Sequence, residues 1–135
     1  MTAAVEAAGP TCGVLAVTVL TSLDDSALGE AWGRDRVDVE HEVLRLAELA
    51  RSCGVHGIVC SGLEAEAVHS RHGDTLKLLV PGIRLPGDPA GDQARIITPE
   101  AAVAAGASYL VLGRAITGSR SPRDAMEAVN KSIGM

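Results

Sequence analysis

Four short stretches of apolar residues divide the chain into repeating units. They lie at residues 14–20, 57–60, 76–80 and 109–112, and each is rich in Val, Leu or Ile. Runs this short and nearly unbroken are typical of parallel strands that are buried on both faces. The pattern therefore predicts four buried strands.

Amphipathic stretches lie between the apolar runs, and the clearest covers residues 39–52. Apolar residues recur there at three- and four-residue spacing, while charged residues take the intervening positions. The predicted inner positions are Val43, Leu46, Leu49 and Ala50, and the predicted outer positions are Glu42, Arg45, Glu48 and Arg51. We expect this helix to pack on the sheet.

Start and stop signals frame the helices. Gly54 and Gly106 each follow a predicted helix and precede a predicted strand, and glycine readily adopts the left-handed conformation that ends a helix. Thr98-Pro99 and Ser121-Pro122 each offer a capping hydroxyl followed by a first-turn proline. Strand and helix thus alternate four times, after what reads as a helix end at residues 2–8, which predicts one α/β domain over residues 1–135 with a parallel sheet.

Composition removes several classes of function. The chain of 135 residues is 47% hydrophobic and only 1% aromatic, and its formal charge is −5. Few aromatic rings and an acidic balance argue against nucleic acid and against anionic membranes as partners. The amino-terminal segment carries no targeting signal, which favours a cytoplasmic protein.

The cysteines follow neither a metal nor a disulfide spacing. Cys12, Cys53 and Cys60 are odd in number and stand in apolar surroundings. The sequence predicts three reduced and buried thiols.

Polar residues follow every apolar run, at the end where an α/β barrel builds its active site. Thr21 and Ser61 follow the first two runs, and Arg84 and Gly113-Arg114 follow the last two. A phosphate group suits this arrangement, since guanidinium groups donate paired hydrogen bonds to it and a glycine lets backbone N–H groups approach. An arginine at a strand end is also often a solvated loop residue, so this motif alone does not distinguish a phosphate site from an ordinary loop.

Six segments, taken in order, give the chain a family resemblance. They are residues 15–22, 57–61, 80–84, 91–95, 98–101 and 112–117. Together they resemble the bacterial orotidine 5′-monophosphate decarboxylases, and the resemblance extends from about residue 2 to residue 133. The succession of Pro81-Gly82-Ile83-Arg84, Gly91-Asp92-Gln93 and Gly113-Arg114 is its most specific part.

The resemblance implies a fold and a binding site. The four strands would be the fifth to eighth of a TIM barrel, so the fold would be a parallel (β/α) half-barrel made of the last four βα units. Thr21 would lie near the pyrimidine of orotidine 5′-monophosphate or of its product, uridine 5′-monophosphate. Four residues would hold the 5′-phosphate: Arg84, Gln93, Gly113 and Arg114. Gln93 would be the latch of a loop between residues 81 and 95 that closes over the phosphate, and the chemistry would need no cofactor or metal.

The residues that perform the family's chemistry are missing. That chemistry depends on an Asp-x-Lys-x-x-Asp segment, which occurs nowhere in this chain. Asp74 and Lys77 have the wrong spacing and should lie at a strand entrance, opposite the site. We therefore expect no decarboxylase activity from this chain alone.

Other polar residues have simpler interpretations. His69 and His72 stand three apart on one predicted helix, but no third metal ligand accompanies them. His41 should be a solvated residue at a helix start, and His56 should mark a strand entrance. Ser61 lacks the surroundings of a nucleophile, so a structural or rim position is expected.

Half a barrel would expose two sheet edges and an apolar face. A homodimer, pairing with a separate amino-terminal half, or truncation of a longer chain would each account for this, with truncation favoured because Met1 falls within an apparent helix. The function is either the decarboxylase of pyrimidine synthesis, as its carboxyl-terminal half, or a non-catalytic nucleotide-phosphate binding module. A barrel enzyme acting on sugar phosphates is a third possibility.

Overall fold

The computed structural model describes residues 1–85 and 95–135. These residues form nine helical elements and four strands. The elements run in chain order as α1 (Thr2–Ala8), η1 (Gly9–Thr11), β1 (Leu15–Val17), α2 (Asp25–Trp32), α3 (Val39–Ser52), β2 (Gly57–Val59), α4 (Gly62–His72), η2 (Gly73–Thr75), β3 (Lys77–Val80), α5 (Pro99–Ala104), β4 (Tyr109–Leu110), α6 (Arg114–Thr117) and α7 (Pro122–Ser132).

The four apolar runs form strands as predicted, and these make one parallel sheet in the order β1-β2-β3-β4. The prediction that all four are buried is wrong for the two edge strands, since β2 and β3 contain buried residues whereas β1 and β4 contain none. Each strand pairs with the next in sequence, so their carboxyl ends all reach the same edge of the sheet. That edge carries the polar residues singled out above. The described residues also include no helix long and apolar enough to cross a membrane.

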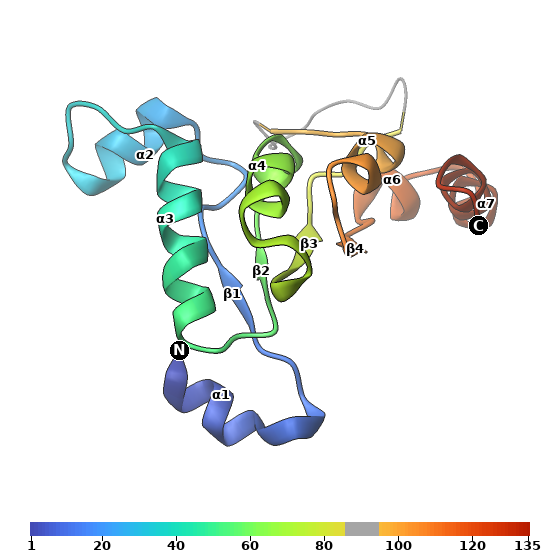
Figure 1. Cartoon of the computed structure of the whole chain (residues 1–135). Helices are drawn as coiled ribbons and strands as arrows, with labels where there is room; N and C mark the ends of the chain where they lie inside the picture. Colours follow the sequence, from blue (N-terminus) through green and yellow to red (C-terminus); the bar gives the residue numbers. More distant parts are fainter. Residues whose placement is uncertain (86–94) are drawn as a thin grey trace.

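Helices cover one face of the sheet, and α3 and α4 pack beside each other there (Figure 1). Ile58, Leu78 and Val80 point into this covered side and are almost completely buried. They join buried residues of α3 and α4 in a single apolar core. The helical layer therefore fixes the positions of the strand ends.

The other face of the sheet is open. Paired positions across the four strands form one row, which consists of Val17, Val59, Leu79 and Tyr109. Val17 is 60% exposed and Tyr109 is 46% exposed, whereas the two central residues are partly buried by their neighbours. We call this row the open face; it is an apolar surface that the described residues leave uncovered.

Helix α3 has the predicted bounds but a rotated inner face. Leu49, predicted to point inward, is 47% exposed, and Glu42, predicted to point outward, is buried. The inner stripe actually consists of Val39, Val43, Ala47 and Ala50. Glu42 tolerates burial because it bonds Arg45 Nε at 2.7 Å and Arg34 Nη1 at 2.9 Å, and the Arg45 hydrogen bond in particular lowers the pKa of Glu42.

The predicted helix signals are confirmed. Gly54 and Gly106 have φ values of 75° and 95°, and the hydroxyls of Thr98 and Ser121 accept from the amides of Ala101 and Asp124. The eight-residue helix α2 was not predicted. Asp24 caps its start, and Gly33, with φ 63°, ends it.

The prediction for the cysteines is right about disulfides and wrong about burial. All three thiols are free, but Cys12 is exposed and Cys53 is half-buried. Cys12 follows η1 at the surface, and Cys53 caps the end of α3. Cys60 alone is buried; its burial and the nearby Glu64 carboxylate raise the pKa of its thiol to about 12, so that the thiol is inert at neutral pH.

Candidate functional site

The carboxyl ends of the four strands form a common rim, and each end is followed by a turn or a helix start. Thr21 lies in a turn after β1, Ser61 caps α4 after β2, Arg84 follows β3, and Gly113 with Arg114 begins α6 after β4. The structure thus brings four of the five predicted binding residues to one edge of the sheet. Gln93 lies outside the described residues.

Thr21 is held in a tight turn and is buried. The turn is closed by the amide of Leu23, which donates to the carbonyl of Leu20 at 3.0 Å, so that Thr21 and Ser22 are its central residues. Before the turn, the Thr18 hydroxyl donates to the Val59 carbonyl at 2.7 Å. This ties the end of β1 to the end of β2.

Arg84 follows a short connection that is anchored by a second contact between backbones. Ile83 forms an isolated parallel bridge with Ile97, in which the Arg84 amide donates to the Ile97 carbonyl at 3.0 Å. The Arg84 guanidinium is buried and donates to the Ile83 carbonyl at 2.8 Å. Gly82, with φ 77°, provides the turn that leads from β3 into this bridge.

Gly113 and Arg114 stand at the exposed part of the rim. Gly113 is the N-cap of α6, and its carbonyl accepts from the amides of Ile116 and Thr117. A Cβ atom added at Gly113 would meet no atom of residues 1–85 or 95–135 within 4 Å, so these residues leave the space beside this helix start open. Backbone N–H groups at such a start favour an anion, and an arginine immediately after the glycine adds positive charge.

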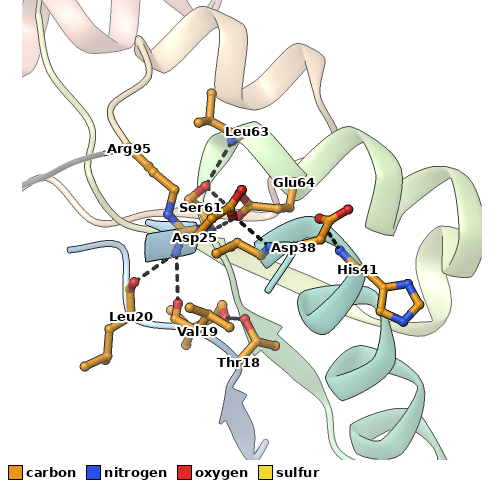
Figure 2. Close-up of polar contacts among 12 residues, drawn as sticks. Thr18, Val19, Leu20, Asp25, Asp38, His41, Ser61, Leu63, Glu64 and Arg95 are labelled. Atoms are coloured by element: carbon orange, nitrogen blue, oxygen red, sulfur yellow. Dashed lines mark hydrogen bonds and ion pairs between the residues drawn. The ribbon is translucent and has the colours of Figure 1, made fainter. Parts of the chain in front are cut away.

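Arg95 is a rim residue that the sequence analysis did not single out. Its side chain is only 7% exposed and forms a 2.7 Å ion pair with Glu64, which is 5% exposed. Ser61 completes the group, because its hydroxyl donates to the other Glu64 oxygen at 2.6 Å (Figure 2). Ser61-x-x-Glu64 is a capping box, and its Ser/Glu spacing is the sequence signal that indicates this pair.

Ser61 therefore has the structural position that was predicted for it. It is completely buried at the start of α4, and the amide of Leu63 donates to its hydroxyl. Its hydroxyl hydrogen goes to a carboxylate rather than to a histidine. This arrangement stabilises a helix start.

A hollow of about 590 Å³ lies beside the rim, where α2, α3 and α4 begin. Asp24 and Asp38 line it, and both already accept hydrogen bonds as helix caps. Asp25 and Glu64 add further negative charge, against the single guanidinium of Arg95. An acidic lining of this kind does not favour a phosphate, so the phosphate candidates remain those after β3 and β4.

The histidines do not share a site. His69 is exposed, whereas His72 is buried at the end of α4, and its burial lowers the pKa of its imidazole. His41 is exposed, as predicted, and His56 immediately precedes β2, which is the strand-entrance position predicted for it. Among residues 1–85 and 95–135, no group of three or more His, Cys, Asp or Glu side chains is arranged to hold a metal ion.

Lys77 lies at the opposite end of the sheet from the rim. It is the first residue of β3, where its ammonium group bonds Asp74 at 3.2 Å. This is the strand-entrance position that was predicted for the pair.

Comparison with known proteins gives a consistent result. Residues 1–129 match the family model described as "Orotidine 5'-phosphate decarboxylase / HUMPS family". The chain is 48% identical over 122 residues to an orotidine 5′-phosphate decarboxylase of Chromobacterium violaceum, and 47% identical over 121 residues to one of Enterobacter sp.. These alignments cover 90% of this chain but only 49% and 48% of the relatives, so the chain spans about half their length.

Solved structures agree with the sequence relatives. The fold matches the crystal structure of orotidine 5′-phosphate decarboxylase from Lactobacillus acidophilus with a TM-score of 0.73 at 35% identity, over 91% of this chain and 50% of that one. It matches the corresponding protein from Pyrococcus horikoshii with a TM-score of 0.64 at 25% identity, over 51% of that chain. Those proteins are TIM barrels, and four parallel βα units make half of such a barrel.

Proposed function

Because the chain belongs to the orotidine 5′-phosphate decarboxylase / HUMPS family, we propose that it is the carboxyl-terminal half of a decarboxylase barrel, which binds orotidine 5′-monophosphate and its product uridine 5′-monophosphate. The observation that carries this proposal is the shared rim: Thr21, Arg84 and Gly113-Arg114 all follow the carboxyl ends of parallel strands. Barrel enzymes build their active sites at this edge.

The proposed roles divide the rim in two. On the side of β1, Thr21 faces the pyrimidine. On the side of β3 and β4, Arg84, Gly113 and Arg114 hold the 5′-phosphate, together with Gln93 from outside the described residues. The open space beside Gly113 supports this division, since a phosphate oxygen needs room to reach the backbone N–H groups of the helix start.

We further propose that the chain does not decarboxylate its substrate alone. It contains two lysines, Lys77 at the entrance of β3 and Lys131 near the end of α7, and neither belongs to an Asp-x-Lys-x-x-Asp segment. A positioned acid is needed to protonate the carbanion that forms when CO₂ leaves. The remaining half of the relatives' length is the natural source of that group.

The open face supports a partner of this kind. Its apolar row is uncovered, and within the described residues β1 and β4 each pair on one side only. A separate or connected amino-terminal half with four further βα units would cover the row and remove both edges. A second copy of this chain is the alternative cover, and either assembly would operate in the cytoplasm.

A complementation experiment tests the proposal. The chain is mixed with the half of the Chromobacterium violaceum relative that its alignment does not cover. The loss of absorbance from orotidine 5′-monophosphate is then followed. We expect activity from the mixture and none from either half. The control is the same amino-terminal half with alanine in place of its motif lysine, which should be inactive.

The outcomes separate the two candidate functions. Activity of the 135-residue chain alone at enzyme-like rates would contradict the proposed division of labour. If the mixture binds uridine 5′-monophosphate but stays inactive, the chain is a nucleotide-phosphate binding module instead. If it binds no nucleotide, the assignment of the rim is wrong.

A further inference from the structure

A buried guanidinium connects two parts of the rim that lie far apart in the sequence. Arg95 Nη1 donates to Glu64 at 2.7 Å, while Nη2 donates to the Leu20 carbonyl at 2.9 Å and to the Val19 carbonyl at 3.4 Å. Figure 2 shows Arg95 between these two carbonyls and the Ser61–Glu64 pair. The side chain thus ties the end of β1 to the start of α4.

The carbonyl of Leu20 has a second function. It also accepts from the Leu23 amide, and this hydrogen bond closes the turn around Thr21 and Ser22. A carbonyl oxygen has two lone pairs, so the turn and the guanidinium can use the same atom. Because the peptide group is planar, fixing the Leu20 oxygen also fixes the amide nitrogen of Thr21.

The energetic cost of this arrangement indicates that the position matters. Burying a charged side chain is expensive unless it is paired and hydrogen-bonded, and the buried Nε of Arg95 has no hydrogen-bond partner among the described residues. Here Glu64 neutralises Arg95, and Glu64 in turn accepts from the hydroxyl and the amide of Ser61. An apolar contact would hold the turn at lower cost but without directing one particular carbonyl.

We propose that Arg95 is a positioning residue for Thr21: it holds the turn after β1 in the conformation that presents Thr21 to the pyrimidine. This inference rests on the proposed function for the pyrimidine, but the contact between Arg95 and the turn stands independently of it. Arg95 touches neither substrate nor product in this role.

The first test compares two ligands. Uridine 5′-monophosphate and ribose 5-phosphate share the phosphate and differ by the base, so their affinity ratio, measured by calorimetry, isolates the pyrimidine side. Arg95→Met should lower this ratio by about tenfold, since one directed hydrogen bond is worth about that factor. Arg95→Lys, which keeps the charge, should restore part of the ratio.

A double substitution makes the link specific. Thr21→Ala should weaken uridine 5′-monophosphate binding in the parent chain and have little further effect in Arg95→Met. A purely stabilising Arg95 would leave the affinity ratio unchanged and give the same Thr21→Ala loss in both backgrounds, and that result would overturn the proposal. Arg51→Met is the matched control, because Arg51 pairs with Glu48 at the surface.

The second test needs no ligand. Hydrogen exchange at the Leu23 amide reports the turn, and Arg95→Met should accelerate it much more than exchange at the Val68 amide within α4. Equal acceleration at both amides would contradict the proposal. If Arg95→Met does not fold, Arg95→Lys carries the same readouts, since a single ammonium group cannot reproduce the fork between Glu64 and Leu20.

The two tests also separate this inference from the proposed function. If the parent chain, alone and with its complementing half, binds neither ligand, the proposed function fails, while the exchange at Leu23 still decides whether Arg95 holds the turn. If both ligands bind and the exchange does not respond, the inference fails alone.

Discussion

The two sides of the rim are built differently. Over β1 and β2, Arg95, Glu64 and Ser61 are buried and hydrogen-bonded to one another, and they hold the turn that carries Thr21. Over β4, Gly113 and Arg114 are exposed at the start of a four-residue helix. The first side is ordered by the protein's own charges, whereas the second is the side that we propose to hold the phosphate. Under the proposed function, preorganisation and ligand capture would therefore be divided between the two ends of the sheet.

The largest expected effect breaks the first side. Glu64→Ala leaves the Arg95 charge buried without its partner, and we expect the free energy of unfolding to fall by about 3–5 kcal/mol. Urea denaturation measures it. Glu48→Ala is the control, because its partner Arg51 is about half exposed and its contact with His72 is long, at 3.8 Å, so the loss should stay below about 1 kcal/mol. Equal losses in the two variants would mean that burial of the Arg95–Glu64 pair is unimportant.

The second prediction concerns the β4 side. Arg114→Ala should weaken binding of uridine 5′-monophosphate by about 2–3 kcal/mol, because charge-assisted hydrogen bonds to the phosphate are lost. Isothermal calorimetry measures the affinity. Arg123→Ala, at an exposed arginine of α7, should leave the affinity unchanged. An unaltered affinity in Arg114→Ala would refute the proposed phosphate contact.

A smaller effect sharpens the comparison through the helix caps. Ser61→Ala removes a buried cap from α4 and should cost about 1–2 kcal/mol of stability. Ser121→Ala removes an exposed cap from α7, and about 0.5 kcal/mol is expected. Thermal unfolding followed by circular dichroism compares them. A larger stability loss in Ser121→Ala than in Ser61→Ala would show that the buried hydroxyl of Ser61 contributes little to the stability of the β1–β2 side.

The smallest effect is a pH response at the other end of α4. Burial keeps the pKa of His72 below its ordinary value of 6.5, so the unfolded chain binds this proton at a higher pH than the folded chain does. Stability contributed by neutral His72 is therefore present above about pH 6.5 and is lost as the pH falls below it. His72→Gln should flatten this slope in denaturation curves, and His41→Gln, at an exposed position, should not.

Much of the fold follows from local patterns. Apolar runs predicted the four strands, and glycine and hydroxyl signals predicted how α3, α5 and α7 begin or end, because these features depend on residues close in sequence. Helix α2 was missed because eight residues give little periodicity. The predicted inner face of α3 was rotated from the observed one. Glu42 can be buried because it pairs with Arg34 and Arg45, and the helical pattern does not reveal these pairs.

The candidate site was only partly predictable for the same reason. Thr21, Arg84, Gly113 and Arg114 were found because each follows a strand and matches a family segment. The Arg95–Glu64 pair was missed, because its partners come from separate βα units and meet only when β1, β2 and the connection before α5 converge. The convergence of Arg84, Gln93 and Arg114 on one phosphate stays a prediction.

The agreement between strand order in space and strand order in the chain has a consequence for folding. Every pairing in the sheet joins a strand to its immediate predecessor, so each new βα unit can dock as soon as it leaves the ribosome. No early strand waits for a distant segment, and loop-closure entropy stays small at each step. Assembly of this layer can therefore proceed vectorially, from α1 toward α7, one βα unit at a time.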